Sequence, residues 1–390
     1  MATPLESLFL VRLRLHSALL VLPHWYLVYC LELQHTSETL LVSPVPSAAE
    51  SITAAVTAAG GAISFEQYMG LALYGEGGFY QDGGKAGRRG DFITSPEVGP
   101  LFAAVVARYL DDCWTELGCP DSFDVVEVGA GPGTLARGIF DAQPKCISAL
   151  KYIAVEISAA QRALHPDFVE SMADFPDREI NGVVLANELL DNLPFKLFVY
   201  DGTWKEAFVA LGDNGKFVEV LRQVDEVPEV LPKTAPLGSR APIQTAASQW
   251  MLNVSQKLSR GRVLIFDYCS ESTSEIAVTP WREWLRTYKE HERGVHYLLD
   301  TGTQDITTQV MVDQLKKTVP GLSVTLQSDW LRRWGIDDLV SEGTQYWDKH
   351  KSAPDVAAMK MRSRANESQE LTNQDGLGGF SVLELHCSIA

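Results

Sequence analysis

Short apolar runs alternate with helical patterns through the middle of the chain. The apolar runs are residues 123–128, 152–156, 182–186 and 262–268, and the helical patterns are residues 134–140, 158–164 and 246–258. Near-continuous apolar strands that alternate with helices are typical of a parallel sheet with both faces covered. The pattern therefore predicts an α/β fold with a mostly parallel sheet and helices on both faces.

Other segments depart from this alternation. Residues 196–220 alternate around Asp201-Gly202 and Asn214-Gly215, which predicts inserted antiparallel hairpins. Residues 324–327 and 380–386 are predicted to form two further strands near the end of the chain. We expect an N-terminal extension over residues 1–50, a helical and lid segment over 51–120, and a main domain over 121–390. The main domain carries insertions at about 195–245 and 270–320.

The charge balance excludes one class of partner. Lys and Arg number 33 against 50 Asp and Glu, which gives a net charge of −17. Nucleic acid as the main partner needs a basic surface, so we expect none. An acidic surface instead attracts cationic protein segments.

Cysteines and histidines indicate neither a disulfide scaffold nor a metal site. The six cysteines are scattered and none forms a C-x-x-C pair, so we expect no metal. Scattered single cysteines in a long chain favour a reducing compartment. We therefore predict a cytoplasmic location.

The N-terminal region leaves a second location open. Its apolar stretches are split by Arg12, Arg14 and His16 and later by Pro23, so it lacks the roughly 20 continuous apolar residues of a membrane span. An Arg-containing stretch with few acids is also compatible with an organellar presequence. If residues 1–40 are such a presequence, the protein is mitochondrial.

A glycine-rich turn follows the first apolar run. Gly129, Ala130, Gly131, Gly133 and Thr134 lie where a strand passes into a helix, and glycines there let a ligand approach backbone amides. The spacing is G-x-G-x-G, whereas a dinucleotide fingerprint reads G-x-G-x-x-G. The turn therefore disfavours NAD(P).

Two acidic residues complete this candidate site. Glu127 precedes the turn and provides a carboxylate for a cationic amino group. Glu156 ends the second apolar run, where ligands of open α/β sheets bind, and a carboxylate there can accept hydrogen bonds from a ribose diol. Together these features predict binding of S-adenosylmethionine, whose sulfonium and amino groups are positive.

Several ordered motifs resemble the MidA-like methyltransferases. The matching stretches are residues 90–97, 126–134, 186–194, 266–268, 285–291 and 304–307. The family includes the mitochondrial protein arginine methyltransferase that assists assembly of respiratory complex I. One departure is Cys269, where the family has a glycine after Asp267-Tyr268, and this puts the local turn geometry in doubt.

The resemblance implies a class I methyltransferase fold, S-adenosylmethionine as donor, and arginine of a protein, in some members a complex I subunit, as acceptor. A pair of carboxylates can bind a guanidinium bidentately, and Glu188 and Asp191 are the candidates. Asn187 is expected to orient either the substrate or the cofactor. Thr94 and Pro96 are expected to contact the cofactor from the glycine-rich loop of residues 83–97, a candidate lid.

Two other functions remain open. One is an assembly factor that binds S-adenosylmethionine without transferring methyl groups, and the less favoured one is an NAD(P)-linked oxidoreductase. The acceptor, the number of methyl groups transferred and the oligomeric state are not determined by the sequence.

Overall fold

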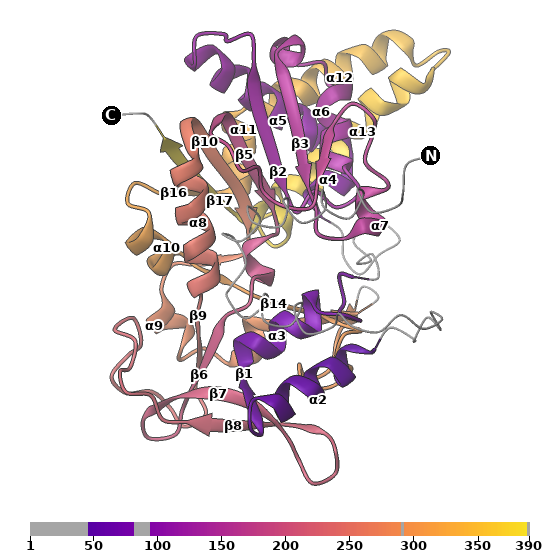
Figure 1. Cartoon of the computed structure of the whole chain (residues 1–390). Helices are drawn as coiled ribbons and strands as arrows, with labels where there is room; N and C mark the ends of the chain where they lie inside the picture. Colours follow the sequence, from indigo (N-terminus) through magenta and orange to yellow (C-terminus); the bar gives the residue numbers. More distant parts are fainter. Residues whose placement is uncertain (1–45, 82–93, 290–291, 388–390) are drawn as a thin grey trace, which may run out of the picture. The chain divides into compact units, whose positions relative to one another are not determined.

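The structure is a computed structural model that describes residues 46–81, 94–289 and 292–387. Residues 45–390 form one compact unit, and the elements described below belong to it (Figure 1). Most of the candidate lid, and the whole candidate presequence, lie outside the described residues.

A sheet of seven strands forms the centre of the described unit. Its order is β16-β17-β10-β5-β2-β3-β4. The strands from β4 to β10 are mutually parallel, and β17 runs antiparallel to both of its neighbours. The strand bounds are β2 Phe123–Val128, β3 Leu150–Val155, β4 Glu170–Met172, β5 Ile180–Asn187, β10 Leu258–Asp267, β16 Ser323–Leu326 and β17 Ser381–Cys387. The prediction of a mostly parallel sheet is confirmed.

Successive residues of the central strands point to opposite faces of this sheet, as strand geometry requires. Val125 and Val183 pack with α5 and α6, whereas Val126 and Val184 pack with α8 and α10. These helices are α5 Pro100–Glu116, α6 Thr134–Asp141, α8 Thr245–Lys257 and α10 Val312–Thr318. Both faces are buried, which explains why the strand sequences are apolar throughout rather than alternating.

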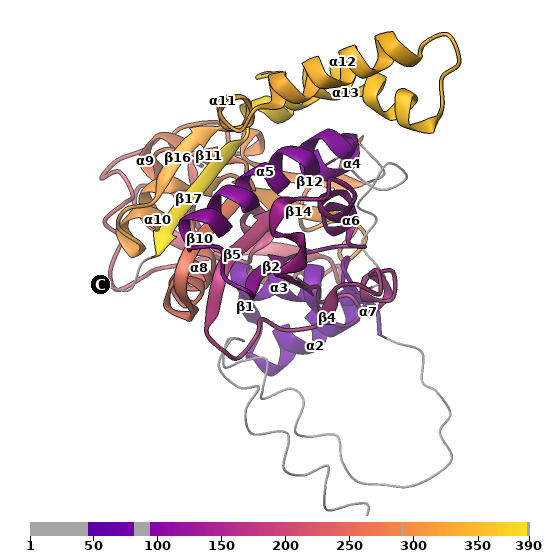
Figure 2. The same ribbon diagram turned by 90° about the horizontal axis from the view of Figure 1, so that it is seen from above.

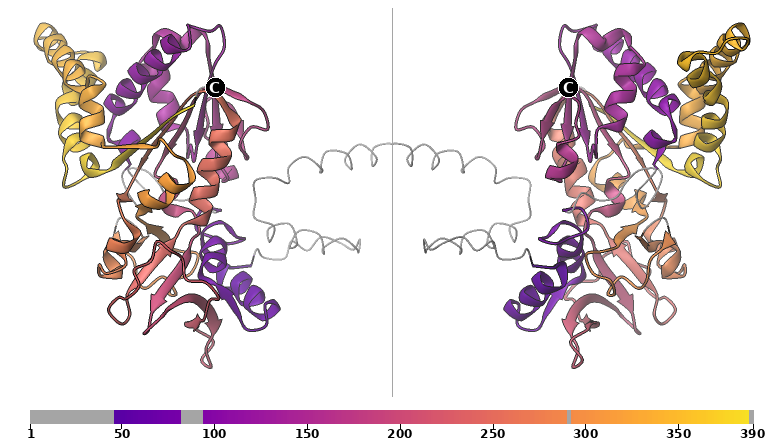
Figure 3. Two further views of the ribbon diagram at one scale, coloured as in Figure 1. Left: turned by 90° about the vertical axis from the view of Figure 1, so that its left-hand side faces the viewer. Right: turned by 90° about the vertical axis from the view of Figure 1, so that its right-hand side faces the viewer.

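A second sheet has the order β1-β7-β6-β9, with β8 paired to β7. Its strands are β1 Ala62–Ser64, β6 Lys196–Tyr200, β7 Trp204–Leu211, β8 Phe217–Arg222 and β9 Arg240–Ile243. The β6–β7 and β7–β8 pairs are antiparallel, so the predicted hairpins are confirmed. Helices α2 (Ala48–Ala58) and α3 (Phe65–Tyr74) pack on it, and Figure 3 shows α2 beside its strands.

The remaining elements surround the two sheets. Near the C-terminus, α12 and α13 lie side by side as a helical pair, and α13 also contacts α4 and α5 (Figure 2). The other elements are α4 Ser95–Val98, η1 Lys145–Ser148, α7 Ala159–Arg162, η2 Leu190–Asn192, β11 Cys269–Ser270, α9 Thr273–Ile276, η3 Trp281–Glu283, β12 Leu285–Lys289, β13 Glu292–Arg293, β14 Asp305–Thr308, β15 Val310–Met311, α11 Gln327–Arg333, α12 Ile336–His350, α13 Val356–Thr372 and η4 Leu377–Gly379.

Two features are absent from the described residues. These residues hold no helix that is both long and apolar enough to cross a bilayer. They also hold no group of three or more His, Cys, Asp and Glu side chains arranged to bind a metal ion.

Candidate active site

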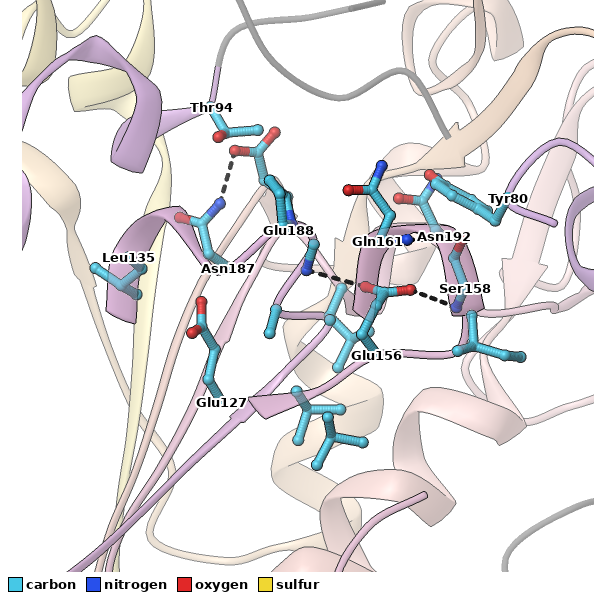
Figure 4. Close-up of a pocket in the computed structure, with 18 of the residues that line it drawn as sticks. Tyr80, Thr94, Glu127, Leu135, Glu156, Ser158, Gln161, Asn187, Glu188 and Asn192 are labelled. Atoms are coloured by element: carbon cyan, nitrogen blue, oxygen red, sulfur yellow. Dashed lines mark hydrogen bonds between the residues drawn. The ribbon is translucent and has the colours of Figure 1, made fainter. Parts of the chain in front are cut away.

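A cavity of about 300 Å³ opens at the carboxyl ends of β2, β3 and β5. Ligands of open α/β sheets bind in this place. We call it the strand-end cavity, and Figure 4 shows its wall. The residues used below that line it are Tyr74, Tyr80, Thr94, Pro96, Glu97, Glu127, Gly129, Ala130, Gly131, Thr134, Glu156, Ser158, Gln161, Asn187, Glu188, Asn192 and Trp250.

The turn between β2 and α6 is held by the acid that ends β3. Gly129 and Gly131 have φ values of 73° and 52°, a backbone region that glycine reaches without strain. The amide of Gly131 donates to Glu156 Oε2 at 2.9 Å, and the amide of Ser158 donates to Glu156 Oε1 at 2.8 Å. Glu156 therefore fixes both loops of the cavity wall (Figure 4).

Glu127 lies at the carboxyl end of β2 with its side chain buried. The hydroxyl of Tyr152 donates to Glu127 Oε2 at 2.7 Å. The pKa of Glu127 is raised to about 7, chiefly by burial and also by the nearby carboxylate of Glu156, while the hydrogen bond from Tyr152 lowers it. A cationic ligand group beside this carboxylate would favour its charged form.

Glu188 has an unusual backbone conformation. Its φ is 50°, which is uncommon for a residue with a side chain and occurs mostly at functional sites. Its amide donates to the carbonyl of Phe266 at 2.8 Å. Asn187 Nδ2 donates to Glu188 Oε1 at 3.0 Å, and the Tyr268 hydroxyl donates to Oε2 at 3.4 Å. The strained backbone is thus held by β10, and the side chain faces the cavity.

The pKa of Glu188 is raised to about 8, first by burial and then by the carboxylate of Asp191. Asp191 itself is 3% exposed and does not line the cavity. Its Oδ2 accepts a hydrogen bond from the Thr307 hydroxyl, and its Oδ1 has no hydrogen-bond partner among the described residues. Burial and the neighbouring Asp267 hold the pKa of Asp191 well above its usual range.

Asp267 shapes the loop that carries Glu188. It is fully buried at the end of β10 and accepts backbone N–H groups from Leu190 at 2.9 Å, Asp191 at 3.4 Å and Tyr268 at 2.8 Å. Its pKa is raised to about 7 by burial, against these hydrogen bonds. Asp267 is therefore a structural acceptor that positions the loop.

Most of the residues expected from the sequence lie around one cavity. Glu127, Glu156, Asn187 and Glu188, the turn residues Gly129 to Gly131 with Thr134, and Thr94 and Pro96 all line it. Gly133 does not; with φ 79° it starts α6. Asp191 also stays outside the cavity wall, so the structure does not bring the two proposed carboxylates together on one surface.

The cavity has an aromatic side that sequence reasoning missed. Tyr74 and Tyr80 stack with ring centroids 5.4 Å apart and an interplanar angle of 15°. Tyr74 donates to the carbonyl of Asn192 at 3.1 Å, and Tyr80 donates to Asp305 Oδ1 at 3.1 Å. Trp250 of α8 also lines the cavity. The aromatic residues that precede the glycine-rich loop were the only sequence signal for this side of the cavity. Their position at the strand ends follows from the fold and not from the local sequence.

The described lining suits a ligand that carries positive charge. It contains the carboxylates of Glu97, Glu127, Glu156 and Glu188 and neither lysine nor arginine. In addition, Asn187 Oδ1 is buried without a hydrogen-bond partner among the described residues, and a buried acceptor of this kind is costly unless a ligand donates to it. The residues present therefore fit S-adenosylmethionine, with its sulfonium and ammonium groups.

Comparisons with curated proteins identify mitochondrial relatives. A protein arginine methyltransferase NDUFAF7 homolog, mitochondrial, from Drosophila melanogaster is 28% identical over 294 residues, 64% of this chain and 65% of that protein. The Homo sapiens protein of that name is 25% identical over 321 residues, 71% of each chain. The chain thus spans slightly less than two thirds of the fly protein's length.

These names correct one expectation. The scattered cysteines favoured the cytoplasm, but the relatives are mitochondrial proteins, and the cytoplasmic prediction is wrong. The inference failed because a reducing environment keeps cysteines unpaired in more than one compartment, so cysteine usage does not separate them.

Comparison with solved structures confirms the class I methyltransferase fold. A COG1565 superfamily member from Burkholderia thailandensis, bound to S-adenosyl-homocysteine, aligns with a TM-score of 0.74 and 28% identity over 88% of this chain and 95% of that chain. Residues 105–327 match the family model described as "Putative S-adenosyl-L-methionine-dependent methyltransferase". The chain belongs to this family of methyltransferases, and S-adenosylmethionine is its methyl donor.

Proposed function

We propose that this methyltransferase modifies an arginine side chain of a protein. The observation that carries the proposal is Glu188, a carboxylate that faces the strand-end cavity with no lysine or arginine beside it in the described lining. Guanidinium is the side-chain cation that pairs best with a carboxylate through parallel hydrogen bonds. The names of the curated relatives, protein arginine methyltransferases, support the same acceptor.

We assign donor binding to the turn and to the two acids at the strand ends. Glu156 would accept hydrogen bonds from the ribose hydroxyls, and Glu127 would hold the amino group. The turn from Gly129 to Gly131 would lie against the donor with its backbone, since no side chain stands at either glycine. The bound donor supplies the methyl group of its sulfonium, and the donor sulfur becomes a neutral thioether once that methyl group is transferred.

Glu188 would bind the acceptor and take up its proton. A guanidinium beside the carboxylate stabilises its charged form, so binding of the acceptor would lower the pKa of Glu188 from about 8. Hydrogen bonds from Asn187 Nδ2 and the Tyr268 hydroxyl fix the carboxylate, so that it can accept a hydrogen bond from the guanidinium nitrogen that takes the methyl group. As a guanidinium nitrogen gains the methyl group, the bond between that methyl group and the donor sulfur breaks and the nitrogen loses one proton. Glu188 Oε1 or Oε2 would receive this proton from the nitrogen that donates to it.

Asp191 would act through Glu188 rather than on the substrate. Its carboxylate raises the pKa of Glu188 while its own side chain points away from the cavity wall. We therefore assign direct contact with the guanidinium to Glu188 and a positioning role to Asp191.

Labelling identifies the acceptor. Purified protein is incubated with methyl-labelled S-adenosylmethionine and mitochondrial extract, and labelled peptides are sequenced by mass spectrometry. We expect label on arginine, and its presence in complex I subunits tests the assembly role that the resemblance predicts. Label on lysine or histidine alone would refute arginine as acceptor. Donor binding without any label would instead support the silent assembly factor.

We also propose a mitochondrial location, in line with the relatives' names. Two fusions to a fluorescent protein are compared in cells: one carries the whole chain, and the shortened one carries residues 46–390 alone. Import of the whole chain but not of the shortened one assigns targeting to the N-terminal residues.

A further inference from the structure

A second, larger cavity adjoins the strand-end cavity. It has a volume of about 760 Å³ and lies between α4, the beginning of α5, α6 and α13. Pro96, Glu97 and Thr134 line both cavities, so this cavity lies directly beside the proposed methyl-transfer site. Figure 2 shows α13 alongside α4 and α5. We call this second cavity the acidic groove.

The charge of the groove is strongly one-sided. Glu97, Asp141, Glu367 and Glu370 line it, and Lys360 is the single basic residue among its described lining. Lys360 lies across from Asp141, with Nζ 3.7 Å from Asp141 Oδ2. Both side chains of this pair are largely exposed, so a cationic ligand can displace Lys360 at small cost.

The floor of the groove is fixed, while its rim is exposed to solvent. Glu367 is buried, accepts the amide of Leu101 at 2.9 Å and receives the hydroxyl of Ser363. A Cβ at Gly99 would come within 2.3 Å of the Glu367 carboxyl group, so α4 and α13 approach closely there. Asp141 and Glu370 are exposed at the rim.

Glu97 lies where the two cavities adjoin. It lines both of them, and its carboxylate lies close enough to Glu188 for the two to repel each other. A positively charged side chain that passes from the groove to Glu188 would meet Glu97 on the way and would relieve that repulsion.

We propose that the acidic groove binds the polypeptide that flanks the target arginine, with a preference for segments rich in arginine and lysine. The inference rests on the proposed function. The groove adjoins the strand-end cavity, so a polypeptide bound in it would lie beside the site of the target side chain. The negative charge of the groove would favour positively charged residues next to that arginine. Nucleic acid is disfavoured as occupant because the lining and the whole chain are acidic.

Charge reversal at the rim tests the proposal. The probe is a fluorescein-labelled peptide of three Gly-Arg-Gly repeats, and its dissociation constant is measured by anisotropy with the full chain saturated with S-adenosylhomocysteine. We expect Glu370→Lys and Asp141→Lys each to weaken binding about three- to tenfold in low salt. Each substitution changes the side-chain charge by two units, and water and salt partly screen its repulsion of the cationic peptide. Lys360→Glu should tighten binding by a similar factor.

Asp213→Lys is the matched control, because it makes the same change in charge at an exposed turn of the β7–β8 hairpin. If Asp213→Lys weakens binding as much as Glu370→Lys, net charge explains the effect and the groove proposal is overturned. A Lys360→Glu variant that binds the peptide no better than wild type counts against it equally.

Donor binding separates this proposal from the proposed function. Calorimetry with S-adenosylhomocysteine should give the same affinity for all four variants, since none of the altered residues lines the strand-end cavity. If labelling finds an acceptor other than arginine while the rim variants still weaken peptide binding, the groove stands and the proposed acceptor fails. If the protein methylates arginine and the KM for the acceptor is unchanged in both rim variants, the groove proposal is refuted and the proposed function stands.

Discussion

Replacing Glu188 with glutamine should stabilise the ligand-free protein while abolishing methyl transfer. The substitution keeps the shape of the side chain and one of its two accepted hydrogen bonds, because the amide NH2 group cannot accept the other. It removes the negative charge, which is poorly solvated at this buried position. The wild-type carboxyl group has a pKa raised from its ordinary value of 4.5 to about 8, first by burial. A group whose folded pKa is raised costs stability whenever the pH exceeds its unfolded value.

The size of the effect follows from this difference in pKa. One pKa unit corresponds to about 1.4 kcal/mol, so 4.5 against about 8 corresponds to at most about 5 kcal/mol. The side chain faces a cavity that solvent can enter, and we therefore expect about 2–4 kcal/mol. The contribution of the protonated group is complete below pH 4.5 and is lost as the pH rises to about 8.

Urea unfolding of the two proteins between pH 5 and pH 9 measures this difference. Wild-type stability should fall relative to Glu188→Gln by up to about 1.4 kcal/mol per pH unit between pH 5 and 8, because the folded state binds one more proton there. The difference should level off above pH 8. Equal denaturant slopes for both proteins at each pH verify that the same surface unfolds.

Two results would refute the reasoning. Parallel stability curves for wild type and Glu188→Gln would mean that the carboxyl group titrates as it does in the unfolded chain. Undiminished transfer to a confirmed acceptor by Glu188→Gln would remove the charge of Glu188 from the proposed function, whatever the stability curves show.

Three further substitutions test other parts of the site. Glu156→Ala removes the acceptor of two loop amides and should weaken S-adenosylhomocysteine binding at least about tenfold in calorimetry; unchanged affinity would exclude Glu156 from donor binding. Asp267→Ala leaves buried backbone N–H groups without an acceptor and should lower the free energy of unfolding by about 3 kcal/mol, with a normal urea midpoint as the contrary result. Gly261→Ala places a Cβ 1.8 Å from the Gly182 carbonyl oxygen and should cost at least about 3 kcal/mol; a melting temperature equal to wild type would show that β5 and β10 separate easily.

Local sequence was sufficient to predict one half of the site. The turn after β2 and the acids Glu127 and Glu156 belong to adjacent strand–turn–helix units, and parallel strands bring their carboxyl ends to one edge of the sheet. The helix predicted at residues 158–164 is shorter in the structure, Ala159–Arg162.

The other half of the site depends on segments that are distant in the sequence. Tyr74 and Tyr80 reach the cavity through hydrogen bonds to Asn192 and Asp305, 118 and 225 residues away. The periodicity of either segment does not predict where Tyr74 and Tyr80 lie. Their position arises from the packing of the second sheet and its helices against the strand ends.

The sequence by itself therefore determined which segments form the parallel strands, the glycine turn and the types of residue at the strand ends, since these follow from backbone preferences and burial along a single segment. Only the tertiary structure decided where each carboxylate points. Glu188 and Asp191 are three positions apart, yet the left-handed backbone of Glu188 turns its side chain to the cavity, while Thr307 from β14 holds Asp191 inside the protein. The orientation of a side chain depends on its partners in space, and those partners come from other parts of the chain.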